Sequence, residues 1–311
     1  VTETEWQYGE KISETDSLGR KTLYQYSDEY GELLETILPN GESCRFTYTS
    51  LGQLTSTQFN NGECWNYRYG AHGELESVTN ALGEEWAYRY DAQGRIVRTT
   101  LPDGNYYSYE YNEQTKRLET YRNIKGQRTQ LTQDLFGRIT RVVLPDNSQY
   151  RYEYSEGHAN PDGSLTKLTT PEGATQHFSY NSERLLTEVV DGNSNKTKYT
   201  YGACDLLNSQ TLPNGERLIF HYDKLTRLTE VRNSQGDSYR YEYDKAGQLI
   251  KETDFTGRAR CYAYDIAGRL IRRIQADGGV ETYVYDENDR LLSYQTWQPK
   301  YQKGEVKAGG K

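Results

Sequence analysis

The phrase AYRYDAQGRI, residues 87–96, recurs along this chain, and the recurrence predicts its fold. Close copies are YRYEYDKAGQL at 239–249, CYAYDIAGRL at 261–270 and TYVYDENDRL at 282–291. The copies share alternating aromatic residues that end on Tyr, then a small polar residue, two variable residues, Gly in all but the last copy, Arg or Gln, and Leu or Ile. A repeat at a fixed period indicates an architecture in which each unit packs on its neighbours.

The last Tyr of each phrase is the anchor of its repeat. Successive anchors lie 21 or 22 residues apart, except for one step of 26 residues between Tyr154 and Tyr180. The anchors are Tyr26, Tyr48, Tyr69, Tyr90, Tyr111, the degenerate Gln133, Tyr154, Tyr180, Tyr201, Tyr222, Tyr243, Tyr264 and Tyr285. We expect a single repeat array over residues 1–297, with an insertion around 155–165, and a flexible tail or linker at 298–311, where the period is lost.

Two kinds of turn separate the strands of each unit. Asp-x-x-Gly follows the anchors, and Leu-Pro-Asn-Gly or Leu-Pro-Asp-Gly stands between them, as at 38–41, 101–104 and 212–215. Asp first, Pro second and Gly fourth are the preferences of type I hairpin turns that end in a glycine bulge. The predicted structural turn residues are Asp91, Gly94, Asp244, Gly247, Asp265, Gly268, Pro39, Gly41, Pro102, Gly104, Pro213 and Gly215.

The strands alternate between aromatic and polar residues. Tyr88 and Tyr90 share one face of the sheet, whereas Arg89 points to the other. Leu or Ile follows most anchors by six residues, so stacked repeats form ladders of aromatic and aliphatic side chains. The predicted aromatic ladder includes Tyr69, Tyr90, Tyr111, Tyr201, Tyr222, Tyr243, Tyr264 and Tyr285. The sequence predicts an all-β chain, a long antiparallel ribbon of about 26 strands that coils because twist accumulates.

The aliphatic content is low for a folded chain. Leu, Ile, Val and Phe make 55 of the 311 residues, about 18%, under the roughly 20% at which chains begin to look disordered. The net charge of −8 is modest, whereas disorder also needs a high net charge. The 30 tyrosines instead predict a fold stabilised by aromatic faces, which bury large areas per residue.

Composition and spacing exclude several classes of function. The excess of acidic residues argues against nucleic-acid binding, and no apolar stretch is long enough to span a membrane. The chain has no Met and no visible signal peptide, which predicts a processed chain or part of a longer one. The four Cys and four His lack ligand spacing, so no metal site, cofactor or disulfide is expected, and unpaired cysteines suit synthesis in the cytoplasm.

The polar residues of the repeat have a structural interpretation that outweighs a catalytic one. Asp at the first turn position accepts backbone N–H groups, and Arg after the turn pairs with neighbouring strands or covers tyrosine rings. No nucleophile, base and acid stand apart from the repeat pattern, so we expect no enzyme activity and no catalytic residue.

The repeats, with YDAQGRI, YDIAGRL and YDENDRL, resemble the RHS/YD-repeat family from about Tyr8 to Leu292. This family includes bacterial Rhs polymorphic toxins, encapsulating components of Tc toxins, and teneurins as distant relatives. The resemblance implies a hollow β-shell that encloses a C-terminal toxin until a secretion apparatus delivers it, as in interbacterial competition. The partners implied are the rest of the shell, the enclosed toxin and secretion-system proteins.

Two departures limit what the resemblance implies. Asp289 replaces Gly in YDENDRL, and the DPxGL-like segment of self-cleaving shells is absent, the nearest string being Asn160-Pro161-Asp162-Gly163 in the oversized unit. The alternative function is a surface, adhesion or carbohydrate-binding module, because short aromatic repeats also stack on sugar faces. Such repeats rely on Trp, of which this chain has only 4.

Overall fold

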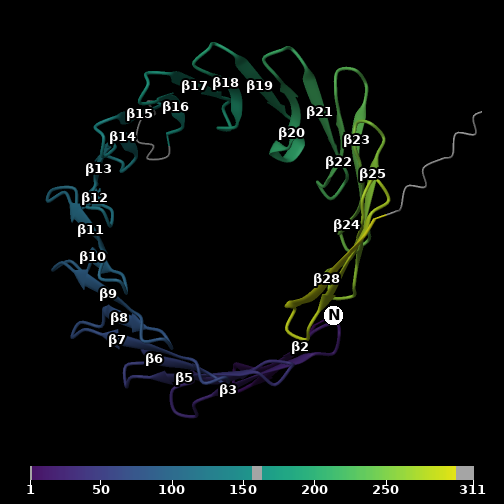
Figure 1. The fold of residues 1–311 in the computed structure, drawn as a ribbon. Coiled ribbons are helices and arrows are strands. Elements are labelled where there is room, and N and C mark those ends of the chain that lie inside the picture. The colour runs from purple at the N-terminus through teal and green to yellow at the C-terminus, as the bar shows by residue number, and fades with distance from the viewer. Residues whose placement is uncertain (1, 156–162, 299–311) are drawn as a thin grey trace, which may run out of the picture. The chain divides into compact units, whose positions relative to one another are not determined.

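The computed structural model describes residues 2–155 and 163–298. In these residues it forms one 28-stranded antiparallel sheet and one short 3₁₀ helix, η1 (Ala203–Asp205) (Figure 1). The predicted all-β ribbon is confirmed, with two strands more than expected. The additional hairpin, β1 (Glu3–Gln7) and β2 (Glu10–Thr15), precedes the first anchor. Its turn has positive φ at Tyr8 and Gly9, the geometry of a two-residue hairpin turn that lacks the repeated phrase.

Thirteen strands end at an anchor residue, and each is followed by a partner strand. The anchor strands are β3 (Lys21–Tyr26), β5 (Ser43–Tyr48), β7 (Cys64–Tyr69), β9 (Glu85–Tyr90), β11 (Tyr106–Tyr111), β13 (Arg128–Gln133), β15 (Gln149–Tyr154), β17 (Thr175–Tyr180), β19 (Lys196–Tyr201), β21 (Arg217–Tyr222), β23 (Ser238–Tyr243), β25 (Ala259–Tyr264) and β27 (Val280–Tyr285). The partner strands are β4 (Leu33–Ile37), β6 (Leu54–Phe59), β8 (Leu75–Thr79), β10 (Ile96–Thr100), β12 (Leu118–Arg122), β14 (Ile139–Val143), β16 (Leu165–Thr169), β18 (Leu186–Val190), β20 (Leu207–Thr211), β22 (Leu228–Arg232), β24 (Leu249–Thr253), β26 (Leu270–Ile274) and β28 (Leu291–Trp297).

A β-bulge stands at the anchor of every described hairpin from β5–β6 to β27–β28. In β7–β8, Tyr69 pairs with Leu75 and Arg68 pairs with Ser77, so Glu76 is an extra residue. A bulge bends its strand and increases the local twist. The repeat therefore supplies, once per hairpin, the curvature that a sheet of this many strands requires.

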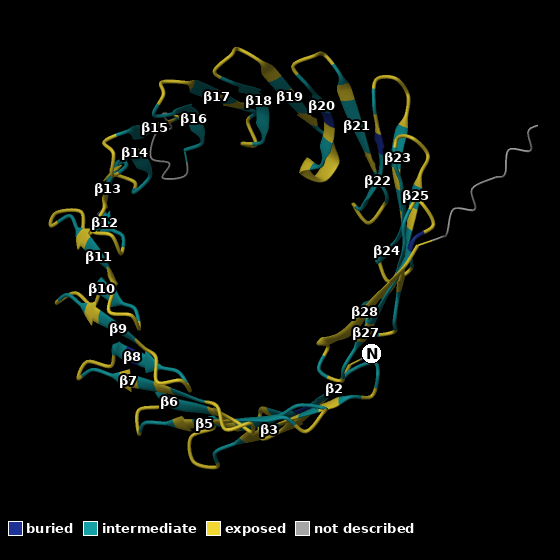
Figure 2. Cartoon of the chain, in the orientation of Figure 1, coloured by how far each residue is buried: buried dark blue, intermediate teal, exposed yellow. Residues whose placement is uncertain are grey.

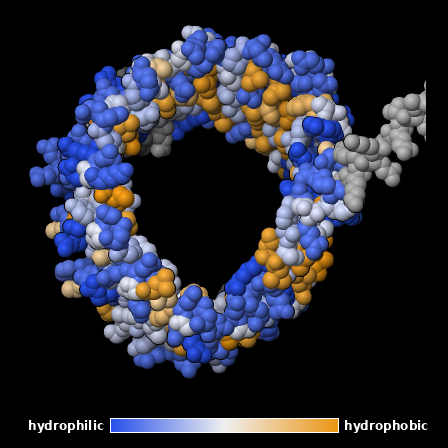
Figure 3. Space-filling model, viewed as in Figure 1, coloured by the Kyte–Doolittle hydropathy of each residue, from blue (hydrophilic) through white to orange (hydrophobic). Residues whose placement is uncertain are grey.

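The sheet is a single layer, and few of its side chains are fully buried. Among the described residues Val231, 9% exposed, is the one apolar residue classed as buried, and most strand residues are half-buried (Figure 2). Apolar side chains gather in patches between larger hydrophilic areas (Figure 3). Side chains on one face thus pack against one another across neighbouring strands. In most folds a second layer of helices or strands would cover such a face.

The chain divides into two compact units. One comprises residues 2–23, Leu38–Gly41 and residues 218–298, and the other comprises Tyr24–Ile37 with Glu42–Arg217 as far as it is described. In the second unit the hairpins follow one another in chain order along the sheet (Figure 1). The predicted insertion around 155–165 falls largely, and the predicted tail 298–311 almost wholly, outside the described residues. The single array over 1–297 stays a prediction.

No helix of the described residues is long and apolar enough to cross a membrane. The four cysteines have free thiols: Cys204 is exposed, and Cys44, Cys64 and Cys261 are half-buried. Cys44 and Cys64 lie in β5 and β7, on either side of β6.

Candidate functional site

The Asp-x-x-Gly segment forms a hairpin turn in which the Asp carboxylate accepts hydrogen bonds from backbone N–H groups. In the β9–β10 turn, the Gly94 N–H donates to the Asp91 carbonyl oxygen at 3.0 Å. The Asp91 Oδ1 atom accepts from the N–H groups of Gln93, at 2.9 Å, and Arg95, at 3.0 Å. Gly94 has φ 77°, a backbone conformation that glycine adopts without strain. The hydrogen bonds of Arg95 hold the pKa of the Asp91 carboxyl below its usual value.

The other predicted turn residues lie in equivalent turns. The Asp265 carboxylate accepts from the N–H groups of Ala267 and Arg269, and the Asp244 carboxylate accepts from the N–H of Gln248. The remaining predicted glycines also have positive φ: Gly41, Gly104, Gly215, Gly247 and Gly268. Pro39, Pro102 and Pro213 each follow a leucine whose carbonyl oxygen accepts from the turn glycine at 2.9 Å, as Leu101 does from Gly104.

In several repeats the arginine after the turn joins one repeat to the next. The Arg95 Nε atom donates to Asp91 Oδ2 at 2.8 Å, and its Nη1 atom donates to the Lys116 carbonyl oxygen in the next turn at 2.8 Å. Its guanidinium also lies 4.2 Å from the centroid of the Tyr111 ring, the next anchor. The same stacking on the next anchor is made by Arg138 on Tyr154, Arg227 on Tyr243 and Arg269 on Tyr285. These contacts combine charge-assisted hydrogen bonds with cation–π attraction.

The anchor tyrosines make a second bond between repeats. The Tyr90 hydroxyl donates to the Leu75 carbonyl oxygen at 2.8 Å, and Leu75 follows the preceding anchor, Tyr69, by six residues. The period of 21 is therefore the sum of this six-residue offset and a fifteen-residue hydrogen bond. The same bond is made by Tyr48, Tyr111, Tyr154, Tyr180, Tyr201, Tyr243, Tyr264 and Tyr285. Tyr69 and Tyr222 are half-buried in the same row.

The degenerate anchor Gln133 retains the hydrogen bond without the ring. Its Nε2 atom donates to the Leu118 carbonyl oxygen at 3.0 Å, across the same fifteen-residue interval. The hydrogen bond explains why this repeat keeps its register although it lacks the tyrosine.

We expect Gln133→Tyr to stabilise the β13–β14 hairpin by about 1 kcal/mol, because the ring adds buried apolar area while its hydroxyl keeps the bond. Hydrogen exchange of the β13 and β14 amides measures the change. Gln133→Leu is the matched control: it adds apolar area but leaves the Leu118 carbonyl without its donor, so it should be no better than the parent chain. A Gln133→Tyr chain that exchanges faster than the parent would contradict the role assigned to the ring.

The face that carries the anchors, here called the tyrosine face, changes character near the end of the chain. The residue two before the anchor pairs with an apolar residue in most earlier hairpins, as Tyr67 does with Val78 and Phe220 with Val231. In β23–β24 the partner of Tyr241 is Glu252, and in β25–β26 the partner of Tyr262 is Arg273. Charged residues thus enter a face that is otherwise largely apolar.

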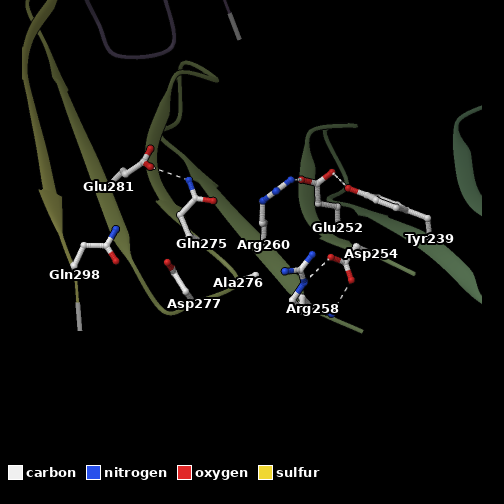
Figure 4. A pocket seen from close by; sticks show the side chains of 10 residues that line it. All are labelled: Tyr239, Glu252, Asp254, Arg258, Arg260, Gln275, Ala276, Asp277, Glu281 and Gln298. Atoms are coloured by element: carbon white, nitrogen blue, oxygen red, sulfur yellow. Dashed lines mark hydrogen bonds and ion pairs between the residues drawn. The ribbon is translucent and has the colours of Figure 1, made fainter. Parts of the chain in front are cut away.

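Glu252 is the centre of a polar cluster on this face, the Glu252 cluster (Figure 4). Its side chain is only 14% exposed and accepts from the hydroxyls of Tyr239 and Tyr262, both at 2.7 Å, and from Arg260 Nη1 at 3.0 Å. Burial, followed by the bond to Glu252, raises the pKa of both tyrosines to about 12. The hydrogen bonds of the same donors hold the pKa of Glu252 below its usual value against the opposing effect of burial.

A cavity of about 620 Å³ opens beside the Glu252 cluster and reaches Glu281 on β27 (Figure 4). Glu281 accepts from Gln275 Nε2, at 2.8 Å, and from the Tyr283 hydroxyl and Arg273 Nε, both at 2.7 Å. The Glu252 and Glu281 carboxylates beside the cavity therefore already accept hydrogen bonds from neighbouring side chains. Across residues 2–155 and 163–298, no three His, Cys, Asp or Glu side chains are grouped to hold a metal ion.

Sequence reasoning missed the Glu252 cluster, although a signal was present. Glu252 occupies the place, nine residues after an anchor, that is taken by Val78, Val142, Val189 and Val231 in other repeats. A residue-by-residue comparison of the repeats would have exposed this substitution. Its partners Tyr239 and Arg260 belong to neighbouring strands, and their side-chain contacts become visible only in three dimensions.

These features define a class: a single-layer β-ribbon whose hairpins are joined by repeated turn, arginine and tyrosine contacts. A teneurin YD-shell family model matches residues 103–221, and an RHS-repeat model matches 71–106 and 222–259, so the matches run without a gap from 71 to 259. The chain belongs to the RHS/YD-repeat family. A search of curated proteins by sequence finds no match.

Solved structures of Tc toxin proteins have a similar fold at 14% sequence identity. The crystal structure of TcdB2-TccC3 without its hypervariable C-terminal region has a TM-score of 0.59, over 97% of this chain and 22% of that chain. The structure of the Photorhabdus luminescens Tc holotoxin pore, which carries a substitution in TccC3, has a TM-score of 0.58, over 94% of this chain and 21% of that one. This chain therefore spans about a fifth of the length of the structures it resembles.

Proposed function

We propose that this chain is a wall segment of an encapsulating shell and that the shell encloses a C-terminal toxic domain of a longer protein until delivery. The observation that carries the proposal is the repeated bonding between hairpins. The tyrosine hydroxyl, turn arginine and backbone ladder each connect one hairpin to the next, as Tyr111 and Arg95 do. Such a wall extends by adding repeats and needs no second layer.

The chemistry of the described residues fits a structural role. The turn carboxylates are engaged by backbone N–H groups and arginines, as Asp91 is, and the carboxylates of the Glu252 cluster by tyrosines and arginines. The partners would be the remainder of the shell, the enclosed toxin and a secretion apparatus that takes the loaded shell from the cytoplasm to the target cell. Family membership and the fold of the Tc toxin neighbours support this role.

Limited proteolysis of the longer protein that contains this segment tests the proposal. We expect its C-terminal region to be cut at least about tenfold more slowly in the intact protein than when it is expressed alone, because an enclosed chain is out of reach of a protease. Electron microscopy of the same sample should show a cavity. Equal cleavage rates, or a solid rod without a cavity, would overturn the proposal.

A further inference from the structure

Four turn arginines, Arg95, Arg117, Arg227 and Arg269, donate to a carbonyl oxygen in the next turn along the chain. Arg117 Nη1 donates to the Asp134 carbonyl at 2.7 Å, and Arg269 Nη1 donates to the Asp286 carbonyl at 3.2 Å. These contacts join neighbouring hairpins, 17 residues apart in sequence.

Arg20 also follows an Asp-x-x-Gly turn, here between β2 and β3, but it reaches a different target. Its Nη1 atom donates to the Glu287 carbonyl oxygen at 2.9 Å, 267 residues further along the chain. Its Nη1 and Nη2 atoms also donate to the two carboxylate oxygens of Asp289 at 2.8 and 3.2 Å. The Arg20 side chain is only 14% exposed, and its Nε atom is oriented by Asp16 Oδ2 at 2.6 Å. A two-pronged contact of this kind recognises a carboxylate specifically.

Two further contacts surround this pair. The Ser17 hydroxyl donates to the Ile266 carbonyl oxygen at 3.0 Å, so Ser17 and Arg20 both tie the Asp16–Arg20 turn to the end of the chain. Arg269 Nη1 donates to Asp289 Oδ1 at 2.7 Å, so Asp289 lies between two guanidinium groups. The Asp16–Arg20 and Asp286–Arg290 turns also line one cavity of about 310 Å³, together with Leu38 and Pro39.

Asp289 occupies the turn position that glycine holds in most repeats, with φ 64°. Thr226 stands at the equivalent position of the Asp223–Arg227 turn, with φ 62°, and its hydroxyl donates to the adjacent Leu225 carbonyl oxygen at 2.6 Å. Glycine suits this backbone conformation better than either residue. The side chain of Thr226 thus makes a local contact. The side chain of Asp289 instead bonds to a turn at the other end of the sequence.

We propose that the Asp286–Arg290 turn is a docking site for the Asp16–Arg20 turn and that Asp289 determines where the first hairpins of the chain attach to the last. The partner of this surface is thus a segment of the same chain, recognised through its guanidinium group. The residue that departs from the repeat pattern is the one that provides the recognition.

Cross-linking of the full chain tests this proposal. In a background with the four native cysteines replaced by serine, Ser17→Cys and Ile266→Cys place two thiols at the contact, and a short bifunctional thiol reagent measures how often they meet. We expect Asp289→Gly to slow cross-linking at least about fivefold, as the loss of a bidentate ion pair should. Thr226→Gly is the matched control, since it also places glycine at the equivalent position of another turn, and it should leave the rate unchanged.

Arg20→Gln tests the same contact from its other side, because it removes the guanidinium and leaves the Asp286–Arg290 turn unchanged. We expect Arg20→Gln and Asp289→Gly to slow cross-linking to a similar extent, and the double variant to be no slower than either, because both remove one interaction. Circular dichroism verifies that each variant retains its sheet. Unchanged cross-linking in a folded Asp289→Gly chain, or effects of the two substitutions that add, would overturn the proposal.

Discussion

Raising the pH from about 10 to about 12 is expected to unfold the sheet, since the tyrosine ladder is built on hydroxyl donors. Burial raises the pKa of Tyr90, Tyr111, Tyr154, Tyr180, Tyr201 and Tyr264, and the pKa of Tyr239 and Tyr262 reaches about 12. A group whose pKa is raised in the folded state contributes stability that is complete below its unfolded pKa and is lost as pH rises through the folded value. Each tyrosinate also loses the proton it donates, so the losses add along the ladder.

Tyrosinate absorbance and far-ultraviolet circular dichroism, recorded together during an alkaline titration, measure this transition. The two signals should change together above pH 10, and the change should reverse on return to neutral pH. Tyr8→Phe is the control because Tyr8 is 97% exposed and lies outside the ladder, so this variant should titrate like the parent. A sheet signal that persists after the tyrosines have ionised would contradict the role of the ladder.

Glu252→Ala is expected to lower the opening free energy of β23–β26 by about 3 kcal/mol, because it leaves buried hydroxyls and a guanidinium without their acceptor. Native-state hydrogen exchange of these strands measures the loss, since each repeat of such a chain opens with its neighbours. Glu242→Ala is the matched control: Glu242 is 54% exposed and pairs only with Lys251 among the contacts assigned to it, so its loss should cost less than about 0.5 kcal/mol.

A second variant separates the Glu252 cluster from simple packing. Glu252→Val, combined with Tyr239→Phe and Tyr262→Phe, gives this site the apolar character that Val231 has in the preceding partner strand. We expect this triple variant to recover most of the lost stability, because no buried hydroxyl then lacks a partner and Arg260 is 50% exposed to solvent. If Glu252→Ala and Glu242→Ala cost the same, the cluster contributes nothing to the stability of the sheet.

The repeat, its turns and its strands could be predicted from the sequence because all three are local. Asp91 and Gly94 form a turn through atoms three residues apart, and alternation along β9 assigns Tyr88 and Tyr90 to one face. The first hairpin, β1–β2, was missed because its Tyr8-Gly9 turn lacks the repeated phrase. The bulge at each anchor was also missed, since the pattern of residue types does not reveal which strand carries an extra residue.

The tyrosine and the aliphatic residue were both recognised in the sequence, but the bond between them was not. Both recur at the same period, so the sequence cannot tell which copy of one meets which copy of the other. The structure assigns the Tyr90 hydroxyl to the carbonyl of Leu75 in the preceding repeat. Repeated residues thus predict a ladder, and only its register requires coordinates.

The fold class, the period and the family follow from the amino-acid sequence, because a phrase that recurs about every 21 residues, a dozen times, constrains every hairpin in the same way. The role of the exceptions to the phrase emerges only in three dimensions. Glu252 and Asp289 read as irregular copies in the sequence, yet each lies where several donors converge. The physical reason is that carboxylates act through donors brought close by folding, and Arg20 and Asp289 are 269 residues apart along the chain.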